Sequence, residues 1–118
     1  MSINIKSSQT PLSDHLRTYV EKRVSYFEKF ISKPDAELQC DVELKDSAHH
    51  QKGPYSYAEI NLMLDGKLYR ATAEAETYEA AIDKVKDDIT RELVKDKKKK
   101  RALWHRGAQK IKSWVRGV

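Results

Sequence analysis

The apolar residues of this chain alternate between the spacing of a helix and the spacing of a strand, and this pattern restricts the fold more than any other feature. Apolar residues recur at steps of three and four in residues 12–30 and again in residues 78–93, as on the buried side of a helix. They alternate with polar residues in residues 36–44, 58–64 and 69–75, as in strands with one buried face. Ile3 and Ile5 alternate in the same way and predict a short first strand.

Turn and capping residues divide these segments from one another. Thr10-Pro11 predicts the start of the first helix, as an N-cap followed by proline in the first turn, and Lys33-Pro34 predicts its end. Asp65-Gly66 predicts a type I′ hairpin turn between the last two strands. Thr77 is a suitable N-cap for the second helix.

The fold class that follows is α+β, with element order β-α-β-β-β-α. The first helix can serve as a crossover that leaves strand 1 parallel to its neighbour, while the other strands form an antiparallel meander. Both helices then cover one face of a four-stranded sheet, as a two-layer sandwich. We expect residues 1–96 to form this α/β domain and residues 97–118 to form a basic C-terminal tail, either disordered or an amphipathic helix.

The positive charge of the chain is concentrated in that tail. Residues 1–94 hold 13 Lys or Arg against 17 Asp or Glu, whereas residues 95–118 hold 10 against one. A segment of this kind is attracted to polyanions such as RNA or an anionic membrane surface. It could also act as a solubilising tail.

Within the domain, the expected open face of the sheet is acidic, because it carries Glu37, Asp41, Glu43, Glu59 and Glu74. A polyanion should therefore approach from the helices. At about 100° per residue, His15, Lys22 and Lys29 fall on one flank of the first helix beside Tyr26, and Lys84, Arg91 and Lys95 line up on the second. These flanks could equally be ordinary solvated helix faces.

Two charged residues complicate this interpretation. Arg23 lies within the apolar stripe of the first helix, so it could extend its head past the sheet edge or towards a ligand. Asp88 could pair with Lys84 or Arg91 and so weaken a binding ridge.

No catalytic, metal or cofactor site is predicted. Ser13-Asp14-His15 has the residue types of a catalytic triad, but neighbours on a helix point in different directions. His49-His50 lacks a third ligand at a characteristic spacing, and Cys40 should point inward as a small hydrophobe. With only four glycines, the chain has no phosphate-binding glycine motif and no sign of a small-molecule substrate.

The chain also lacks the sequence features of membrane insertion and secretion. It has no run of about 18 apolar residues, and no apolar segment follows Met1. We therefore expect a cytoplasmic protein with no stable membrane insertion.

Three segments closely resemble the bacterial ribosome hibernation promoting factor family, which includes ribosome-associated inhibitor A. They are Ile3-Asn4-Ile5, Leu16-Arg17-Thr18-Tyr19-Val20 and, above all, Tyr78-Glu79-Ala80-Ala81-Ile82-Asp83. The resemblance runs from about residue 2 to residue 97 in one register, and the chain length matches the short type, without the C-terminal dimerisation domain of long members.

This resemblance implies a fold similar to double-stranded RNA-binding domains and a non-catalytic function. The partners it implies are the small ribosomal subunit with its rRNA and whole ribosomes, where the protein would occupy the mRNA and tRNA channel and silence translation in stress or stationary phase. Off the ribosome, we expect a monomer. The alternative is an RNA-binding or anionic-membrane-binding module that acts through its basic tail.

The residues expected to bind RNA come from both arguments. By the resemblance, basic helix residues would contact rRNA phosphates, which position the protein and make its affinity salt-sensitive. The family often carries lysine in the middle of each helix, where this chain has Tyr26 and Asp88. The full expected set is Arg17, Lys22, Arg23, Lys29, Lys84, Arg91, Lys95, Lys97, Lys98, Lys99, Lys100 and Arg101.

Overall fold

A computed structural model describes residues 2–7, 12–31, 38–47 and 55–116, and for residues 100–116 it describes the backbone alone. The predicted α+β class and the β-α-β-β-β-α order are confirmed, with one short helix, η1, added after α1. The elements are β1 (Ser2–Ser7), α1 (Asp14–Val24), the 3₁₀ helix η1 (Ser25–Phe30), β2 (Leu38–Ser47), β3 (Tyr55–Leu64), β4 (Lys67–Ala75) and α2 (Tyr78–Arg116).

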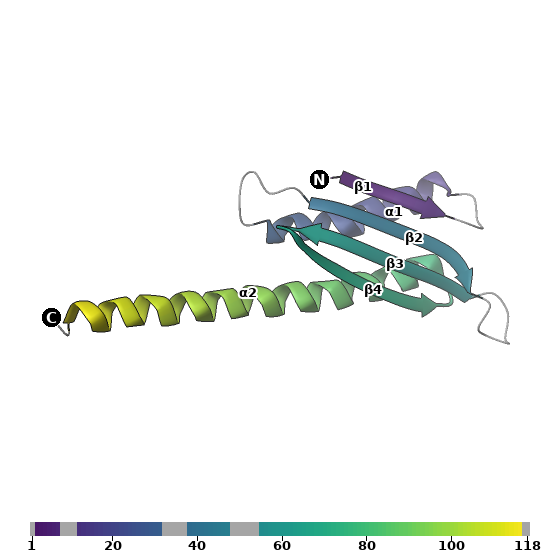
Figure 1. Cartoon of the computed structure of the whole chain (residues 1–118). Coiled ribbons are helices and arrows are strands. Elements are labelled where there is room, and N and C mark those ends of the chain that lie inside the picture. Colours follow the sequence, from purple (N-terminus) through teal and green to yellow (C-terminus); the bar gives the residue numbers. More distant parts are fainter. Residues whose placement is uncertain (1, 8–11, 32–37, 48–54, 117–118) are drawn as a thin grey trace.

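The four strands form one sheet in the order β1-β2-β3-β4 (Figure 1). β1 pairs parallel with β2, so that Ile3 lies opposite Cys40, and the other two pairings are antiparallel. The parallel pair requires a crossover, which the segment containing α1 provides, as predicted. At the predicted hairpin between β3 and β4, Asp65 and Gly66 have φ of 51° and 78°, the positive values that a type I′ turn requires.

The core lies between the inner face of the sheet and the two helices, which occupy the same side of it (Figure 1). The alternation predicted for β2 and β3 is confirmed, because every second residue is buried from Leu38 to Leu44 and from Ala58 to Leu64. The largest fully buried side chains come from both layers: Phe27, Leu44, Ile60, Leu62, Ile82, Ile89, Val20, Val24, Val42, Val85 and Cys40. The helical stripes and strand faces read from the sequence therefore meet in a single core.

The first helix begins later than predicted. Its N-cap is Ser13, whose Oγ accepts a hydrogen bond of 3.1 Å from the amide of Leu16. The negative charge of Asp14 in the first turn stabilises the helix, because it lies next to the positive end of the helix dipole. The predicted N-cap at Thr10 was therefore wrong as the start of this helix, because Ser13 satisfies the same requirement nearer the apolar stripe. Thr10-Pro11 and the predicted end at Lys33-Pro34 lie outside the described residues.

The second helix is much longer than its apolar stripe. Thr77 is its N-cap, as predicted, because its Oγ1 accepts a hydrogen bond of 3.1 Å from the amide of Ala80. The helix then runs for 39 residues, first across β3 and β4 and then beyond the sheet (Figure 1). The boundary predicted between residues 96 and 97 falls within it, and the division into a domain and a basic tail stays a prediction.

Candidate nucleic-acid interface

The two helices meet along a line of polar and aromatic side chains that we call the inter-helix seam. It is formed by His15, Tyr19, Arg23, Tyr26, Lys29 and Phe30 from α1 and η1, and by Glu79, Asp83, Lys86 and Lys97 from α2. Acidic residues lie at the end of the seam where α2 begins, and lysines lie at the other end. The seam is therefore polarised along its length.

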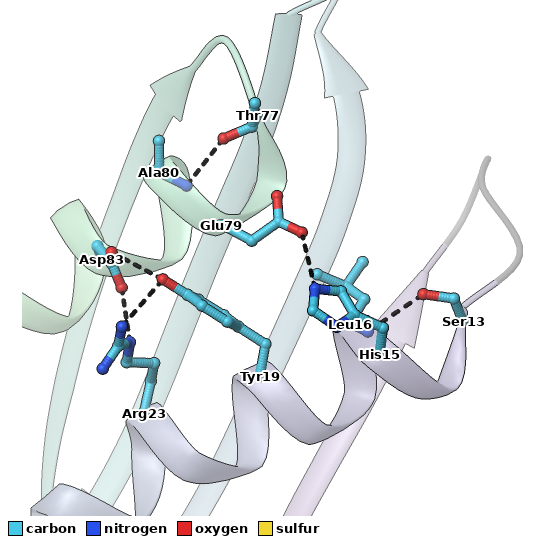
Figure 2. Close-up of polar contacts among 9 residues, drawn as sticks. All are labelled: Ser13, His15, Leu16, Tyr19, Arg23, Thr77, Glu79, Ala80 and Asp83. Atoms are coloured by element: carbon cyan, nitrogen blue, oxygen red, sulfur yellow. Dashed lines mark hydrogen bonds and ion pairs between the residues drawn. The ribbon is translucent and has the colours of Figure 1, made fainter.

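At the acidic end, the charged groups bind one another. Tyr19 donates a hydrogen bond of 2.9 Å to Oδ2 of Asp83, and Nε of Arg23 lies 3.0 Å from Oδ1 of the same carboxylate (Figure 2). Arg23 also donates to the hydroxyl of Tyr19 over 3.2 Å, and His15 lies 3.9 Å from Glu79. The guanidinium of Arg23 is thus directed at the second helix.

The hydrogen bond to Tyr19 and the charge of Asp83 raise the pKa of Arg23 above its ordinary value. The residue is therefore a permanent cation with two partners inside the protein. An RNA phosphate would have to compete with both of them.

At the opposite end lies the basic-aromatic cluster, which consists of Tyr26, Lys29, Phe30, Lys86 and Lys97. The ammonium groups of Lys29 and Lys86 lie 4.4 Å and 4.3 Å from the centre of the Tyr26 ring, and that of Lys97 lies 5.9 Å from the centre of the Phe30 ring. The two rings contact edge to face, with centroids 5.9 Å apart. Cations interleaved with partly exposed aromatic rings can hold phosphates and stack unpaired bases.

Sequence reasoning placed Lys29 and Lys97 in this interface but missed Lys86 and did not use Phe30. The signal for Lys86 was its spacing, because it follows Asp83 by three residues and precedes Lys97 by 11, which puts all three on one flank of a helix. The flank chosen from the sequence, with Lys84, Arg91 and Lys95, is a different one.

Two residues of that other flank make contacts within the protein, Lys84 with β4 and Arg91 with its own helix. Lys84 donates to the backbone carbonyl of Glu74 over 3.3 Å. Arg91 lies 2.6 Å from the carboxylate of Asp88, so the pairing considered from the sequence is present. Lys84 and Arg91 therefore lie apart from the basic-aromatic cluster.

The remaining predicted residues are not among those that form the seam. Five of them are exposed on their helices: Arg17, Lys22, Lys95, Lys98 and Lys99. For Lys100 and Arg101 the structure gives only the helical backbone. RNA binding by the predicted residues stays a prediction.

The open face of the sheet carries acidic residues, as the sequence predicted. Glu59 is only 9% exposed and accepts from Arg70 over 2.6 and 2.8 Å. Burial and the nearby carboxylate of Glu59 raise the pKa of Tyr57. Glu37, also predicted for this face, lies outside the described residues. A polyanion is therefore better accommodated on the helical side.

Cys40 and His15 show no arrangement suited to catalysis. Burial raises the pKa of the free Cys40 thiol to about 12, so it stays protonated and unreactive. Ser13 caps α1 while His15 faces Glu79, so the Ser-Asp-His sequence forms no relay.

The described part of the chain contains neither a metal-binding group nor a membrane span. It holds no set of three or more His, Cys, Asp or Glu side chains placed to bind a metal ion. Over the same ranges, no helix has both the length and the apolar character needed to cross a bilayer. His49-His50 falls outside them.

Comparison with known proteins gives consistent matches. The family described as sigma 54 modulation protein / S30EA ribosomal protein matches residues 3–101. A ribosome hibernation promoting factor from Azotobacter vinelandii is 33% identical over 99 residues, which cover 84% of this chain and 85% of that protein. A ribosome hibernation promotion factor from Picosynechococcus is 30% identical over 88 residues, which cover 75% of this chain but only 42% of that longer protein.

Two solved structures share the fold. The N-terminal domain of Protein Y from Thermus thermophilus superposes with a TM-score of 0.67 at 28% identity, over 79% of this chain and 96% of that domain. A ribosomal subunit interface protein from Coxiella burnetii gives a TM-score of 0.65 over 82% of this chain and 98% of its own. At 18% identity, the second likeness concerns the fold alone.

Proposed function

Because this chain belongs to the sigma 54 modulation protein / S30EA ribosomal protein family, we propose that it is a ribosome hibernation factor. In this proposal the protein binds the small ribosomal subunit or the whole ribosome in the cytoplasm, occupies the mRNA and tRNA channel, and silences translation in stress or stationary phase. Its action is steric, so it needs no catalytic group. It reaches the ribosome as a monomer.

The observation that carries the proposal is the basic-aromatic cluster on the side of the molecule away from the acidic sheet face. All five of its residues lie within the part of the chain that the family match covers. Lysines there can neutralise rRNA phosphates, and the rings can stack on unpaired bases. Specificity for the ribosome would then come from the shape of the cleft, since phosphate contacts carry no sequence information.

Tyr26 and Asp88 occupy the helix positions where the family often has lysine. Tyr26 lies beside Lys29 and Lys86, so positive charge is present at that position although the residue itself is neutral. Asp88 instead binds Arg91. These contacts favour rRNA binding through the seam over binding through the β4 side of α2.

Co-sedimentation with ribosomes through sucrose gradients, at low and at moderate salt, tests the proposal. The wild type should migrate with small subunits or whole ribosomes at both salt concentrations. The double variant Lys29→Gln/Lys86→Gln should bind at low salt and dissociate at moderate salt. The two lost phosphate contacts lower its affinity at both salt concentrations, so the further loss of affinity that salt causes is enough to release it.

The matched control is Lys6→Gln/Lys45→Gln, which removes the same charge from the open sheet face, where Lys45 lies 4.6 Å from the Tyr57 ring centre. This variant should bind as the wild type does. Equal losses in both variants would mean that net charge rather than the seam drives binding. A wild type that leaves ribosomes at moderate salt would contradict the proposal.

Occupation of the channel is tested by competition. Ribosomes loaded beforehand with mRNA and initiator tRNA should bind the protein far more weakly than empty ribosomes. Unchanged binding to loaded ribosomes would place the protein elsewhere on the particle.

The extension of α2 favours a second candidate, in which this segment binds RNA or an anionic membrane by itself. Residues 97–116 hold nine Lys or Arg and no Asp or Glu, on a continuous helical backbone. The variant Lys98→Gln/Lys99→Gln/Lys100→Gln leaves the seam intact. If this triple variant loses binding to ribosomes, or to vesicles containing anionic lipid, while Lys29→Gln/Lys86→Gln keeps it, the extension is the binding element.

A further inference from the structure

A small pocket opens where α2 leaves the sheet, beside the basic-aromatic cluster. Its volume is about 130 Å³, and it lies between the end of η1, the β3–β4 hairpin and α2. A larger hollow of about 450 Å³ on the other side of α2 is lined by Asp88 and Arg91, which bind each other. The smaller pocket is the one continuous with the seam, because Lys29, Phe30 and Lys97 belong to both.

The floor of the small pocket is apolar. Leu64 and Leu93 are 6% and 3% exposed, and Phe30 and Ile31 are half-buried beside them. An apolar protein cavity of roughly 150 Å³ is known to hold a benzene ring. A volume of about 130 Å³ therefore suits one six-membered planar ring and excludes a whole nucleotide.

The rim of the pocket is charged, and its charges are arranged unevenly. On the hairpin side, Lys67 binds Asp96, and Tyr69 donates a hydrogen bond of 2.6 Å to the same carboxylate. Lys29 extends from η1 and Lys97 from α2, and their ammonium groups lie over the rings of Tyr26 and Phe30. Cations flanking a ring-sized apolar floor match a nucleotide whose base enters while its phosphates stay outside.

We propose that this base pocket receives one unstacked pyrimidine base of single-stranded RNA. The base packs against Phe30 and the two leucines, and Lys29 and Lys97 bind the phosphates on either side. Asp96 at the rim can accept from the exocyclic amino group of cytosine, which makes cytosine the preferred base. The inference rests on the proposed function, since it names the part of rRNA that the seam would recognise.

An aromatic side chain of a protein would also fit the floor. It brings no anion for Lys29 and Lys97, however, and a base brings a phosphate on each side. The continuity of the pocket with the cationic seam therefore favours RNA, and the test includes the protein ligand as an outcome.

The test compares two five-residue RNA backbones with equal numbers of phosphates and a terminal fluorophore. One carries a single cytidine at the centre with abasic residues around it, and the other is abasic throughout. By fluorescence anisotropy, the wild-type protein should bind the cytidine probe roughly 5- to 100-fold more tightly, the range typical of one stacked base. Equal affinity for the two probes would overturn the proposal.

Two pocket variants locate the effect without changing charge. Ile31→Trp should fill the pocket and abolish the difference between the probes, and Phe30→Leu should reduce it while keeping an apolar side chain. The matched control is Met63→Trp, which places the same large ring on the open sheet face, where Met63 is 39% exposed. Discrimination that survives Ile31→Trp, or that Met63→Trp abolishes equally, would overturn the assignment.

Two further experiments separate the base pocket from a protein-binding site and from the proposed function. If uncharged N-acetylphenylalanine amide displaces the cytidine probe and binds more tightly than cytidine, the pocket is a site for protein side chains and the RNA proposal fails. Ribosome co-sedimentation keeps the two proposals apart. Ribosome binding without probe discrimination overturns the base pocket alone, whereas discrimination without ribosome binding overturns the proposed function alone.

Discussion

The Nε atom of Arg23 lies 3.0 Å from Oδ1 of Asp83, and this ion pair joins α1 to α2 across 60 residues of sequence (Figure 2). Tyr19 donates to the other oxygen of the same carboxylate. The carboxylate of Asp83 therefore joins the two helices and at the same time binds Arg23, which is expected to bind RNA. An RNA phosphate would have to compete with Asp83 for the guanidinium of Arg23.

Replacing Asp83 by Asn should strengthen binding to RNA and to ribosomes. The substitution frees the Arg23 guanidinium and removes a negative charge from the seam. Each added phosphate contact should steepen the dependence of log affinity on log salt by about one. Titrations at several salt concentrations measure both changes.

The control for this prediction is Asp87→Asn, which removes the same charge from the exposed side of α2. It should leave the salt dependence unchanged. If Asp83→Asn and Asp87→Asn behave alike, Arg23 does not reach RNA in either protein.

Replacing Ile89 by Ala should destabilise the fold strongly. The Ile89 side chain is 1% exposed in the layer between α2 and the sheet, so the variant loses buried area and leaves a cavity, at a cost of about 2–5 kcal/mol in the free energy of unfolding. Val94, on the same helix, is 37% exposed, and Val94→Ala should cost less than about 1 kcal/mol. Urea denaturation measures the two values. Similar losses would mean that this part of α2 packs differently from the structure.

The arrangement of the sheet and both helices was predictable because hydrophobic period alone distinguishes a buried helix stripe from a strand face. The alternation from Leu38 to Leu44 determines which face of β2 is buried, and the Asp65-Gly66 turn pairs β3 with β4 as a hairpin. Both features are needed to form the core. The start of α1 was less predictable, because Thr10 and Ser13 are both good caps and tertiary packing decides between them. The change to a 3₁₀ helix at Ser25 has no comparable sequence signal.

The seam was only partly predictable, for a different reason. Sequence period places Lys84 and Lys86 on different flanks of α2 but cannot say which flank faces the first helix. That depends on how the helices cross the sheet, which brings Lys86 to Tyr26 and Lys84 to the backbone of Glu74. The pairing of Arg91 with Asp88 was anticipated because both lie within one helical turn.

Replacing Asp96 by Asn should reduce stability near neutral pH and have less effect in acid. The hydrogen bonds from Lys67 and then from Tyr69 hold the pKa of Asp96 below its ordinary value. A carboxylate with a lowered pKa stabilises the fold above the pKa of the unfolded chain, which is about 3.9, and this contribution disappears as pH falls through the lower folded pKa. The difference in urea midpoint between wild type and variant should thus be constant from neutral pH to about pH 5, and shrink below about pH 4.

Tyr69→Phe removes only one of the two hydrogen-bond donors to Asp96 and should give a smaller difference in the same pH window. A difference for Asp96→Asn that does not change between pH 7 and pH 3 would show that the ionised carboxylate contributes nothing to stability.

Tyr26 and Tyr57 provide the sharpest comparison for the role of aromatic rings in binding. Each lies under a lysine ammonium group, Tyr26 in the seam and Tyr57 on the acidic sheet face. Tyr26→Leu should weaken binding to small subunits by roughly 5- to 100-fold, because a stacking surface is lost, while the salt dependence stays the same because no cation is removed. Tyr57→Leu should leave both quantities unchanged. If Tyr26→Leu instead reduces the salt dependence, the ring acts by positioning Lys29 and Lys86 for phosphates rather than by stacking on a base.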